Sequence, residues 1–315
     1  MEFVRAVPSQ PLRVRVYIPH FCGRLESSRY ASGRSEERWL RQLAFSRCLL
    51  ALQAQRRRRR DLLLNIRERL VDVLAAARLG EEELPELRLT IVVVSNGHDR
   101  LVEVLEAFRD DVQEHVVTVD DPQRLPLQTR ALLVEDREPA DLWLYLEDDL
   151  VLLDPLFFDK QWWWLQRCGE RMVLMPHRYE LVRGGAGGRL LVDGPLQPGL
   201  IDPLNDPREA VLRASFAGRE VVFDRTANPH AGLFVISENQ RRELAQGVLP
   251  EQGFVGPLET AATLTVLHRY PVCKPSLEHR RFLMVEHGHP SFRGLVESMP
   301  LRPLVSTELL GRLEW

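Results

Sequence analysis

Three adjacent acids, Glu147, Asp148 and Asp149, close a run of large apolar residues in the stretch LWLYLEDD (142–149). An ionised side chain without a partner costs several kcal/mol in a dry interior, so such residues are rare at the end of a buried strand. In open α/β sheets, ligands bind outside the carboxyl ends of the strands. The acids are therefore expected to face a binding crevice.

The spacing of the acids favours a divalent cation as the ligand. With strand geometry to residue 149, Glu147 and Asp149 project to one side and Asp148 to the other. Two carboxylates on one side can share one cation, and ligation by oxygen suits Mg²⁺ or Mn²⁺, which also bind substrate phosphates. The alternative is a cluster of acids that caps the next helix near Asp154. We expect the metal site.

A small-residue stretch, NPHAGLFVIS (228–237), carries the next candidates. Ala231 and Gly232 give a backbone that a flat ring can approach closely. Asn228 and His230 supply hydrogen-bonding groups beside it. The stretch is interpreted either as a sugar-facing segment or as an ordinary turn into a strand.

Two C-terminal stretches add titratable side chains. In FLMVEHGHPSF (282–292), His287 and His289 share a face if the segment is extended, as the residue before a proline favours. Imidazole suits Mn²⁺ somewhat better than Mg²⁺, although a histidine is more often a plain hydrogen-bonding group. In GFVGPLETAATL (253–264), Glu259 opens a helix-like run. It is either a general base or only a favourable charge at a helix start.

The elements that must position these residues alternate along the first half of the chain. Strands are expected at 12–19, 89–97, 114–121 and 142–149, and helices at 36–54 (capped by Ser35), 63–74, 100–108 and 127–137. The second helix is expected from apolar residues at helical spacing, namely Leu63, Ile66, Leu70 and Leu74. Such alternation predicts an α/β fold with an open, mostly parallel sheet flanked by helices.

Composition excludes several classes of protein. The chain has 315 residues, of which 44% are hydrophobic and 28% charged, with a formal net charge of −3. This is enough apolar material for a large core, and the charge gives no reason to expect a nucleic-acid partner. The four cysteines stand far apart without a CxxC pair, which favours reduced thiols over a disulfide framework or a zinc site.

No apolar stretch approaches the ~18 residues of a transmembrane helix, and the N-terminus has no segment of signal-peptide type. We therefore expect a cytoplasmic protein without a transmembrane segment. The five consecutive arginines Arg56 to Arg60 leave peripheral contact with anionic lipid headgroups open, although a solvated face is the simpler interpretation.

A βαβ half followed by an apolar strand that ends in Glu-Asp-Asp resembles the nucleotide-sugar glycosyltransferases of the GT-A fold. The acidic motif of that family, usually Asp-x-Asp, is matched by Glu147-Asp148-Asp149, with Glu in place of the first Asp. The resemblance implies that Asp149 binds the metal that bridges the diphosphate. It also implies that Glu147 contacts the ribose or the metal.

The same resemblance assigns the remaining stretches. It places 228–237 against the donor sugar and the acceptor, and it closes the metal sphere with a C-terminal histidine, for which we prefer His287 to His289. Glu259 stands where inverting members keep an acid that deprotonates the acceptor hydroxyl, but the acidic pair usual in the family is absent there. The implied architecture is a single GT-A-like domain over 1–315. It has a Rossmann-like nucleotide half at 1–149 and a sugar and acceptor half at 150–315.

The implied reaction moves a sugar from a nucleotide-diphosphate donor to a carbohydrate, lipid or small-molecule hydroxyl, with Mn²⁺ or Mg²⁺ acting as a Lewis acid on the leaving diphosphate. Two alternatives stay open. A metal-dependent nucleotidyltransferase or phosphodiesterase would use the same acids and release pyrophosphate or a monophosphate. A non-catalytic relative would bind sugar nucleotides without turnover.

Overall fold

The computed structural model describes residues 10–23, 38–80, 82–182, 188–197, 200, 205 and 212–301. The predicted helix cap at Ser35 lies outside these residues. All four cysteines are free, which agrees with the prediction of reduced thiols. In the part of the chain that is described, no helix is long and apolar enough to cross a membrane.

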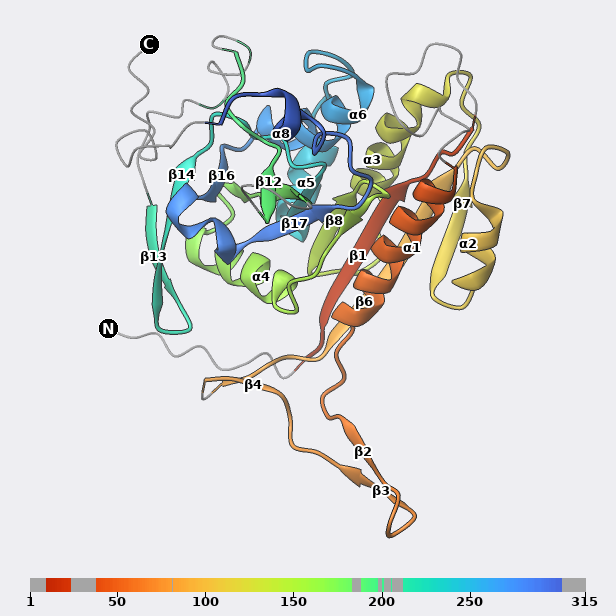
Figure 1. The fold of residues 1–315 in the computed structure, drawn as a ribbon, viewed down its shortest axis with the longest axis vertical. Coiled ribbons are helices and arrows are strands. Elements are labelled where there is room, and N and C mark those ends of the chain that lie inside the picture. Colours follow the sequence, from red (N-terminus) through yellow and green to blue (C-terminus); the bar gives the residue numbers. More distant parts are fainter. Residues whose placement is uncertain are drawn as a thin grey trace.

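A five-stranded sheet forms the centre of the molecule (Figure 1). In spatial order its strands are β15 (Leu233–Ser237), β8 (Leu142–Leu146), β1 (Leu12–Pro19), β6 (Leu87–Ser95) and β7 (Val112–Val116). Strands β8, β1, β6 and β7 run parallel, whereas β15 pairs with β8 in the antiparallel direction. The prediction of an open, mostly parallel sheet is therefore confirmed.

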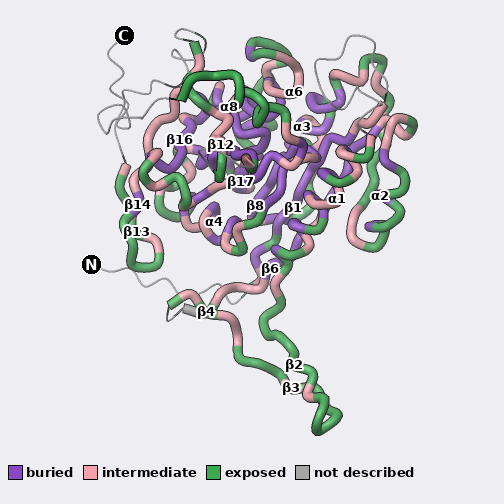
Figure 2. The backbone as a smooth tube through the Cα atoms, viewed as in Figure 1, coloured by how far each residue is buried: buried purple, intermediate pink, exposed green. Residues whose placement is uncertain are grey.

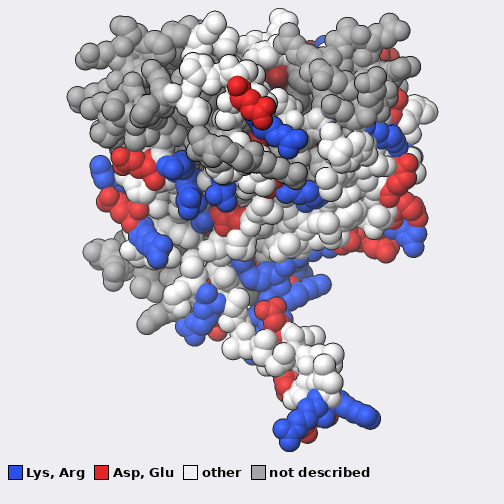
Figure 3. All heavy atoms as spheres, in the orientation of Figure 1, with Lys and Arg blue, Asp and Glu red and all other residues white. Residues whose placement is uncertain are grey.

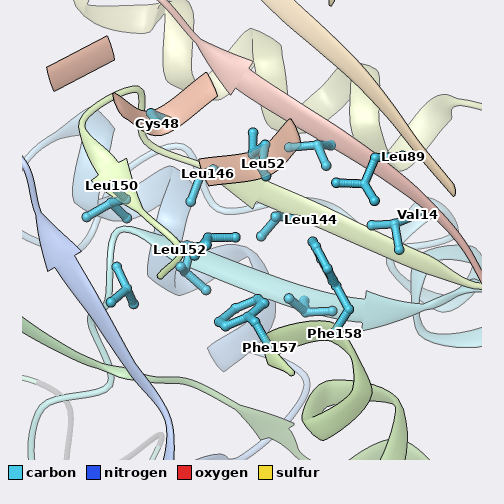
Figure 4. Packing of buried hydrophobic residues seen from close by; sticks show 14 of the residues in the cluster. Val14, Cys48, Leu52, Leu89, Leu144, Leu146, Leu150, Leu152, Phe157 and Phe158 are labelled. Carbon is cyan, nitrogen blue, oxygen red and sulfur yellow. The ribbon is translucent and has the colours of Figure 1, made fainter. Parts of the chain in front are cut away.

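Helices cover both faces of this sheet. They are α1 (Arg38–Gln55), α2 (Val102–Ala107), α3 (Leu125–Glu135), α4 (Phe157–Cys168) and α5 (Glu238–Ala245). Alternate residues of β8 and β15 enter different cores because successive side chains of a strand point to opposite faces. Leu144 of β8 packs with Leu52 of α1 in one core cluster, whereas Tyr145 joins Leu133 of α3 in the other. Figure 4 shows part of the first cluster, and Figure 2 shows the buried residues along the central strands.

Two smaller sheets extend the central one. The first contains β10 (Val173–Leu174), β16 (Val272–Pro275), β14 (Arg219–Arg225) and β13 (Leu212–Phe216). The second contains β12 (Arg189–Leu191), β11 (His177–Leu181), β17 (Met284–His287) and β9 (Leu150–Val151). Because β9 follows the acids directly and pairs with β17, the second sheet brings the C-terminal part of the chain to the end of β8.

The predicted helix over 63–74 is wrong. These residues form a hairpin of β2 (Leu62–Asn65) and β3 (Leu70–Val73) that projects from the body of the molecule (Figure 1). The turn between the strands is closed by Asn65, whose Oδ1 accepts a hydrogen bond from Glu68 N at 3.1 Å, and Arg69 has a positive φ of 54°. Local side-chain hydrogen bonding of this kind favours a turn over a helix, so the helical spacing of the leucines misled the prediction.

The strand predicted over 142–149 ends earlier, at Leu146, and the acids lie in the loop that follows. The remaining elements are short. They are β4 (Arg78–Leu79), β5 (Glu82–Glu83), α6 (Pro257–Glu259), α7 (Thr265–Leu267) and α8 (Leu295–Ser298). A π-helical turn at Thr260–Leu264 joins α6 to α7, so Glu259 stands in the first turn of one continuous helical segment, as predicted.

Candidate active site

A cavity of about 560 Å³ lies at the carboxyl end of β8. All three acids line it, together with residues from distant parts of the chain, which include Pro19, Phe21, Arg41, Arg178, Asp193, Asn228, His230, Glu259, His287, Ser291 and Phe292. Three other predicted site residues, Ala231, Gly232 and His289, do not line it. The carboxyl end of parallel strands is where open α/β sheets bind their ligands.

The three acids do not divide between two sides as expected. Asp148 and Asp149 both bind the guanidinium of Arg41, with 3.0 Å between Arg41 Nη1 and Asp149 Oδ2. Glu147 lies beside a second guanidinium, with Oε2 3.8 Å from Arg178 Nη1. The strict alternation of a strand does not apply because the strand has already ended. The acids therefore meet two different arginines.

Asp148 is fully engaged by the protein. Leu101 N donates to His20 Nε2 at 3.0 Å, so the ring proton of the neutral imidazole is on Nδ1, which donates to Asp148 Oδ2 at 2.7 Å. The other carboxylate oxygen accepts from Arg41. Both oxygens of Asp148 thus accept hydrogen bonds from the protein, which holds the loop in place.

Arg41 is the cation that the acids share, and sequence reasoning missed it. It lies on the buried face of α1, beside Ala44 and Phe45. Burial opposes its charge, but Asp148 and Asp149 outweigh that effect and raise the pKa of the guanidinium. The sequence carries no clear signal for this role, because the large apolar residues Trp39, Leu43 and Leu50 of the same helix are exposed.

Glu147 is buried between β8 and β15. Its backbone N–H donates to Gly232 O at 3.0 Å. Gly232 has a φ of +65°, and a Cβ at this position would lie 2.7 Å from Glu147 Oε2. Ala231 is packed in the core. Gly232 thus makes room for the acid, which fits the interpretation of the stretch as a turn into a strand, one of the two that the sequence left open.

Glu147 and Asp149 have opposite pKa shifts. Burial raises the pKa of Glu147 to about 8, which Arg178 only partly offsets and which Asp149 and Glu259 increase. Burial also acts on Asp149, but His287 and Arg41 overcome it and lower the pKa of that carboxyl. At neutral pH Asp149 is therefore ionised, whereas Glu147 favours its protonated form until a bound cation displaces the proton.

The C-terminal segment brings His287 to Asp149. In the β17–β9 pairing His287 lies opposite Leu150, and Gly288 N donates to Asp149 O at 2.7 Å. His287 Nε2 is 3.5 Å from Asp149 Oδ2. Burial opposes a charge on the imidazole, but Asp149 and then Glu180 raise its pKa to about 9. His289 is also buried and acts on Asp149 through its charge, from outside the cavity wall.

Glu180, a second residue that sequence reasoning missed, orients His287. Its Oε1 accepts from His287 Nδ1 at 2.8 Å, which leaves Nε2 directed at Asp149. The carboxylate also accepts from three consecutive backbone N–H groups, those of Ser291, Phe292 and Arg293, at 2.6–3.1 Å. Glu180 thereby ties β11 to the loop after β17.

Asn228 and His230 line the cavity, but protein partners hold their polar groups. Asn228 Nδ2 donates to Gly194 O at 2.9 Å, and Asn228 Oδ1 accepts from His230 N at 3.1 Å. His230 Nδ1 lies 2.8 Å from Thr263 Oγ1. Burial, followed by the charge of Arg178, lowers the pKa of His230 well below its usual value, so this ring is neutral.

Behind these residues, Asp193 joins two buried cations. Arg178 Nη2 lies 2.8 Å from Asp193 Oδ1, and Lys274 Nζ lies 3.2 Å from Oδ2. Burial alone would raise the pKa of Asp193, but Arg178 and Lys274 lower it well below the usual range. Lys274 Nζ also donates to His230 O at 2.6 Å. This buried network fixes Arg178 beside Glu147.

Two buried oxygens can accept a cation. Glu147 Oε1 and Asp149 Oδ1 have no hydrogen-bond partner among the described residues, and both side chains line the cavity. His287 Nε2 is adjacent to Asp149. Within the described ranges no group of three or more His, Cys, Asp or Glu has the geometry of a complete metal site. Mn²⁺ or Mg²⁺ often takes only one or two carboxylates from a protein and completes its sphere with water and substrate phosphate, so these two carboxylates are the candidates for such an ion.

Comparison with protein-family models and with curated protein sequences finds no match. Comparison with solved structures finds neighbours of low sequence identity. A structure of S. aureus TarS 1-349 is 10% identical, with a TM-score of 0.40, and the match covers 84% of this chain and 58% of that one. GalNAc-T7, crystallised with UDP, GalNAc and Mn²⁺, is 11% identical, with a TM-score of 0.43 and coverages of 88% and 43%. The chain thus spans about half the length of these neighbours.

Proposed function

We propose that this chain is a glycosyltransferase that moves a sugar from a nucleotide-diphosphate donor to an acceptor hydroxyl with the aid of Mn²⁺ or Mg²⁺. The observation that carries the proposal is the pair of buried oxygens, Glu147 Oε1 and Asp149 Oδ1, without hydrogen-bond partners in the described part of the chain. Buried acceptors are normally satisfied, so two unsatisfied oxygens on side chains that line one cavity support the proposal of a bound cation.

The charges around the cavity suit a diphosphate held through a cation. Asp149 and Glu147 would hold the metal, and His287 would complete the protein's share of the ligands once the cation has displaced its Nε2 proton. The bound metal would act as a Lewis acid on the leaving diphosphate. Arg41 fixes Asp149, and Glu180 fixes the ring of His287, so both ligands are positioned before the substrate arrives.

The donor would extend from the metal along the carboxyl end of the sheet. Pro19 is the last residue of β1 and Phe21 follows the strand; both line the cavity, where Phe21 would offer an aromatic ring to a nucleobase. In this arrangement residues 1–149 form the nucleotide half of a single GT-A-like domain. Residues 150–315 supply the sugar and acceptor side, with Asn228 and His230 on the wall.

Glu259 is proposed as the general base. It lines the same cavity, and its charge acts on the buried Glu147, so both belong to one electrostatic site. In an inverting transfer the acceptor oxygen forms a bond to the anomeric carbon while the bond from that carbon to the diphosphate oxygen breaks. The hydroxyl proton passes to the carboxylate of Glu259.

The test is a screen of nucleotide sugars by thermal shift, with Mn²⁺ or with EDTA, followed by product analysis. A ligand at ~100 times its dissociation constant adds about 2.7 kcal/mol of stability. We expect a metal-dependent shift that Asp149→Asn removes and that the control Asp72→Asn, in the projecting hairpin, retains. Release of a nucleoside diphosphate is the expected product. Pyrophosphate or monophosphate release would replace the proposal with a nucleotidyltransferase or phosphodiesterase. Equal donor binding with EDTA would exclude the metal.

A further inference from the structure

The hairpin β2–β3, called the arm below (Leu62–Val73), is amphipathic. Cross-strand partners lie on one face of a hairpin, and the register pairs Leu62 with Val73 and Leu64 with Val71. These four side chains form an entirely apolar face, and they are 68%, 59%, 65% and 54% exposed in that order. The opposite face is mixed, and on it Asn65 Nδ2 donates to Asp72 Oδ2 at 3.3 Å.

The arm stands apart from the candidate active site. It follows the end of α1 and precedes β6, at the amino ends of the parallel strands, whereas the cavity lies at their carboxyl ends. Figures 1 and 2 show it projecting from the body with nearly all of its length exposed. An isolated two-stranded hairpin is marginally stable in water. An apolar face on such an element therefore indicates that the arm binds something.

Arginines mark both ends of the apolar face. Arg59 and Arg60 lie at the base and Arg69 at the tip, all exposed, and none makes an ion pair with a residue that the structure describes. Figure 3 shows the cationic side chains gathered at the tip and where the arm meets the body. By contrast, Arg56, Arg57 and Arg58 pair with acids of the body. The run of five arginines is therefore divided: the first three pair with the body, and Arg59 and Arg60 leave their charge at the base of the arm.

We propose that the arm docks this protein on an anionic lipid surface. The apolar face would lie at the boundary between headgroups and acyl chains, while the arginines at the base and tip reach lipid phosphates. The inference does not depend on the reaction proposed above. Because the cavity is at the opposite end of the sheet, docking would locate the protein at the membrane and leave the cavity facing away from it.

A second copy of the chain fits the arm less well. At roughly 60–120 Å² per fully buried Leu or Val, four side chains offer at most about 500 Å². Specific protein interfaces need about 800 Å² per partner. Two arms stacked on their apolar faces would also bring arginines together, tip to tip or tip to base, and like charges repel. Area and charge together favour the lipid surface.

The experiment is co-flotation of the full chain with vesicles of phosphatidylcholine alone or with about a third phosphatidylserine. We expect binding to the anionic vesicles only, and its loss near 1 M salt, where the Debye length is ~3 Å. Each arginine near such a surface contributes about 1 kcal/mol, or about fivefold in partitioning. The variant R59Q/R60Q/R69Q should therefore bind roughly 100-fold more weakly. The control R109Q/R213Q/R242Q removes three exposed arginines of the body and should bind normally.

The apolar face has a matched control on the same arm. Leu62→Ser with Leu64→Ser should weaken vesicle binding about tenfold or more, because buried methyl and methylene groups are lost. Leu63→Ser with Leu70→Ser alters the opposite face and should have a clearly smaller effect. Melting temperatures of all variants establish that the body is folded. The proposal is overturned if anionic vesicles do not bind the wild type, or if both pairs of variants lose binding equally. It is also overturned if light scattering shows a dimer that the arm variants convert to monomers without loss of vesicle binding.

Discussion

The two ends of the central sheet are built in opposite ways. At the carboxyl ends of the strands, charged side chains are buried: Arg41, Asp148, Glu147 and Arg178 are all nearly inaccessible to solvent. At the amino ends, the arm exposes apolar side chains to solvent. Globular proteins usually do the reverse, burying apolar groups and exposing charges.

Burying charges and exposing apolar side chains both cost stability, but the two costs affect the fold differently. Buried charges must be paired and hydrogen-bonded, so the carboxyl end is rigid and each residue depends on another. The exposed apolar face of the arm has no such dependence, and its side chains can change without disturbing the body. Both ends of the sheet depart from the usual pattern, which is expected where the residue types serve function and not stability.

The largest expected effect is at Glu259, in the cavity. As the general base it acts in the transition state, so Glu259→Gln should lower turnover by roughly 10²–10⁴ and leave donor and metal affinity nearly unchanged. The measurement is single-turnover transfer with the donor found in the screen. Glu68→Gln, in the turn of the arm, is the control and should transfer normally. Near wild-type turnover in Glu259→Gln would remove this residue from the mechanism.

Arg41 tests the dependence of the buried charges on one another. Arg41→Met leaves Asp148 and Asp149 buried without their shared cation, and breaking a buried ion pair in this way costs about 3–5 kcal/mol. The free energy of unfolding from urea denaturation should fall by that amount. Arg60→Met on the arm should change it by less than about 0.5 kcal/mol. Similar values for the two variants would contradict the contrast between the ends of the sheet.

The sequence predicted the strands around the site better than the site itself. The apolar runs of β1, β6 and β8 are local signals, and the acids stand next to one of them. The partners of the acids are not local. Arg41 reaches Asp148 across 107 residues, and Glu180 reaches His287 across the same separation. The positions of Arg41 and Glu180 in the sequence do not identify the residues that they contact. The assignments of the metal ligands, the nucleotide site and the general base therefore remain predictions.

Glu180 should have an intermediate effect. Carboxylates that orient a ligating histidine typically change metal affinity 10–100-fold when mutated, so Glu180→Gln should weaken Mn²⁺ binding by that factor. Calorimetric titration with Mn²⁺ is the measurement, and the His287→Ala variant sets the full loss of the ligand. If Glu180→Gln binds Mn²⁺ normally but unfolds more easily, its role is confined to holding residues 291–293. If His287→Ala also binds Mn²⁺ normally, the C-terminal ligand is wrong.

The sequence of the arm explains why the predicted helix over 63–74 is wrong. Leu63, Ile66, Leu70 and Leu74 recur at helical spacing, but Leu62, Leu64, Val71 and Val73 alternate with other residues at strand spacing in the same stretch. The apolar residues therefore fit both a helix and a strand, and the turn at Asn65 favours the hairpin. A short run rich in leucine does not distinguish the two periods when no core selects one face.

The smallest expected effect completes the comparison between the ends of the sheet. Leu64 on the arm and Leu144 in β8 are the same residue type, but Leu64 is mostly exposed and Leu144 is fully buried. Leu144→Ala removes core contacts and should cost about 2–5 kcal/mol. Leu64→Ala removes none from the body, so the free energy of unfolding should change by less than about 0.5 kcal/mol. Urea denaturation of the two variants without lipid measures both values. Ordinary surface substitutions change the free energy of unfolding by at most about 0.5 kcal/mol. A loss above about 1 kcal/mol in Leu64→Ala would therefore mean that the apolar face is already covered in solution. In that case the arm would not be available to a lipid surface.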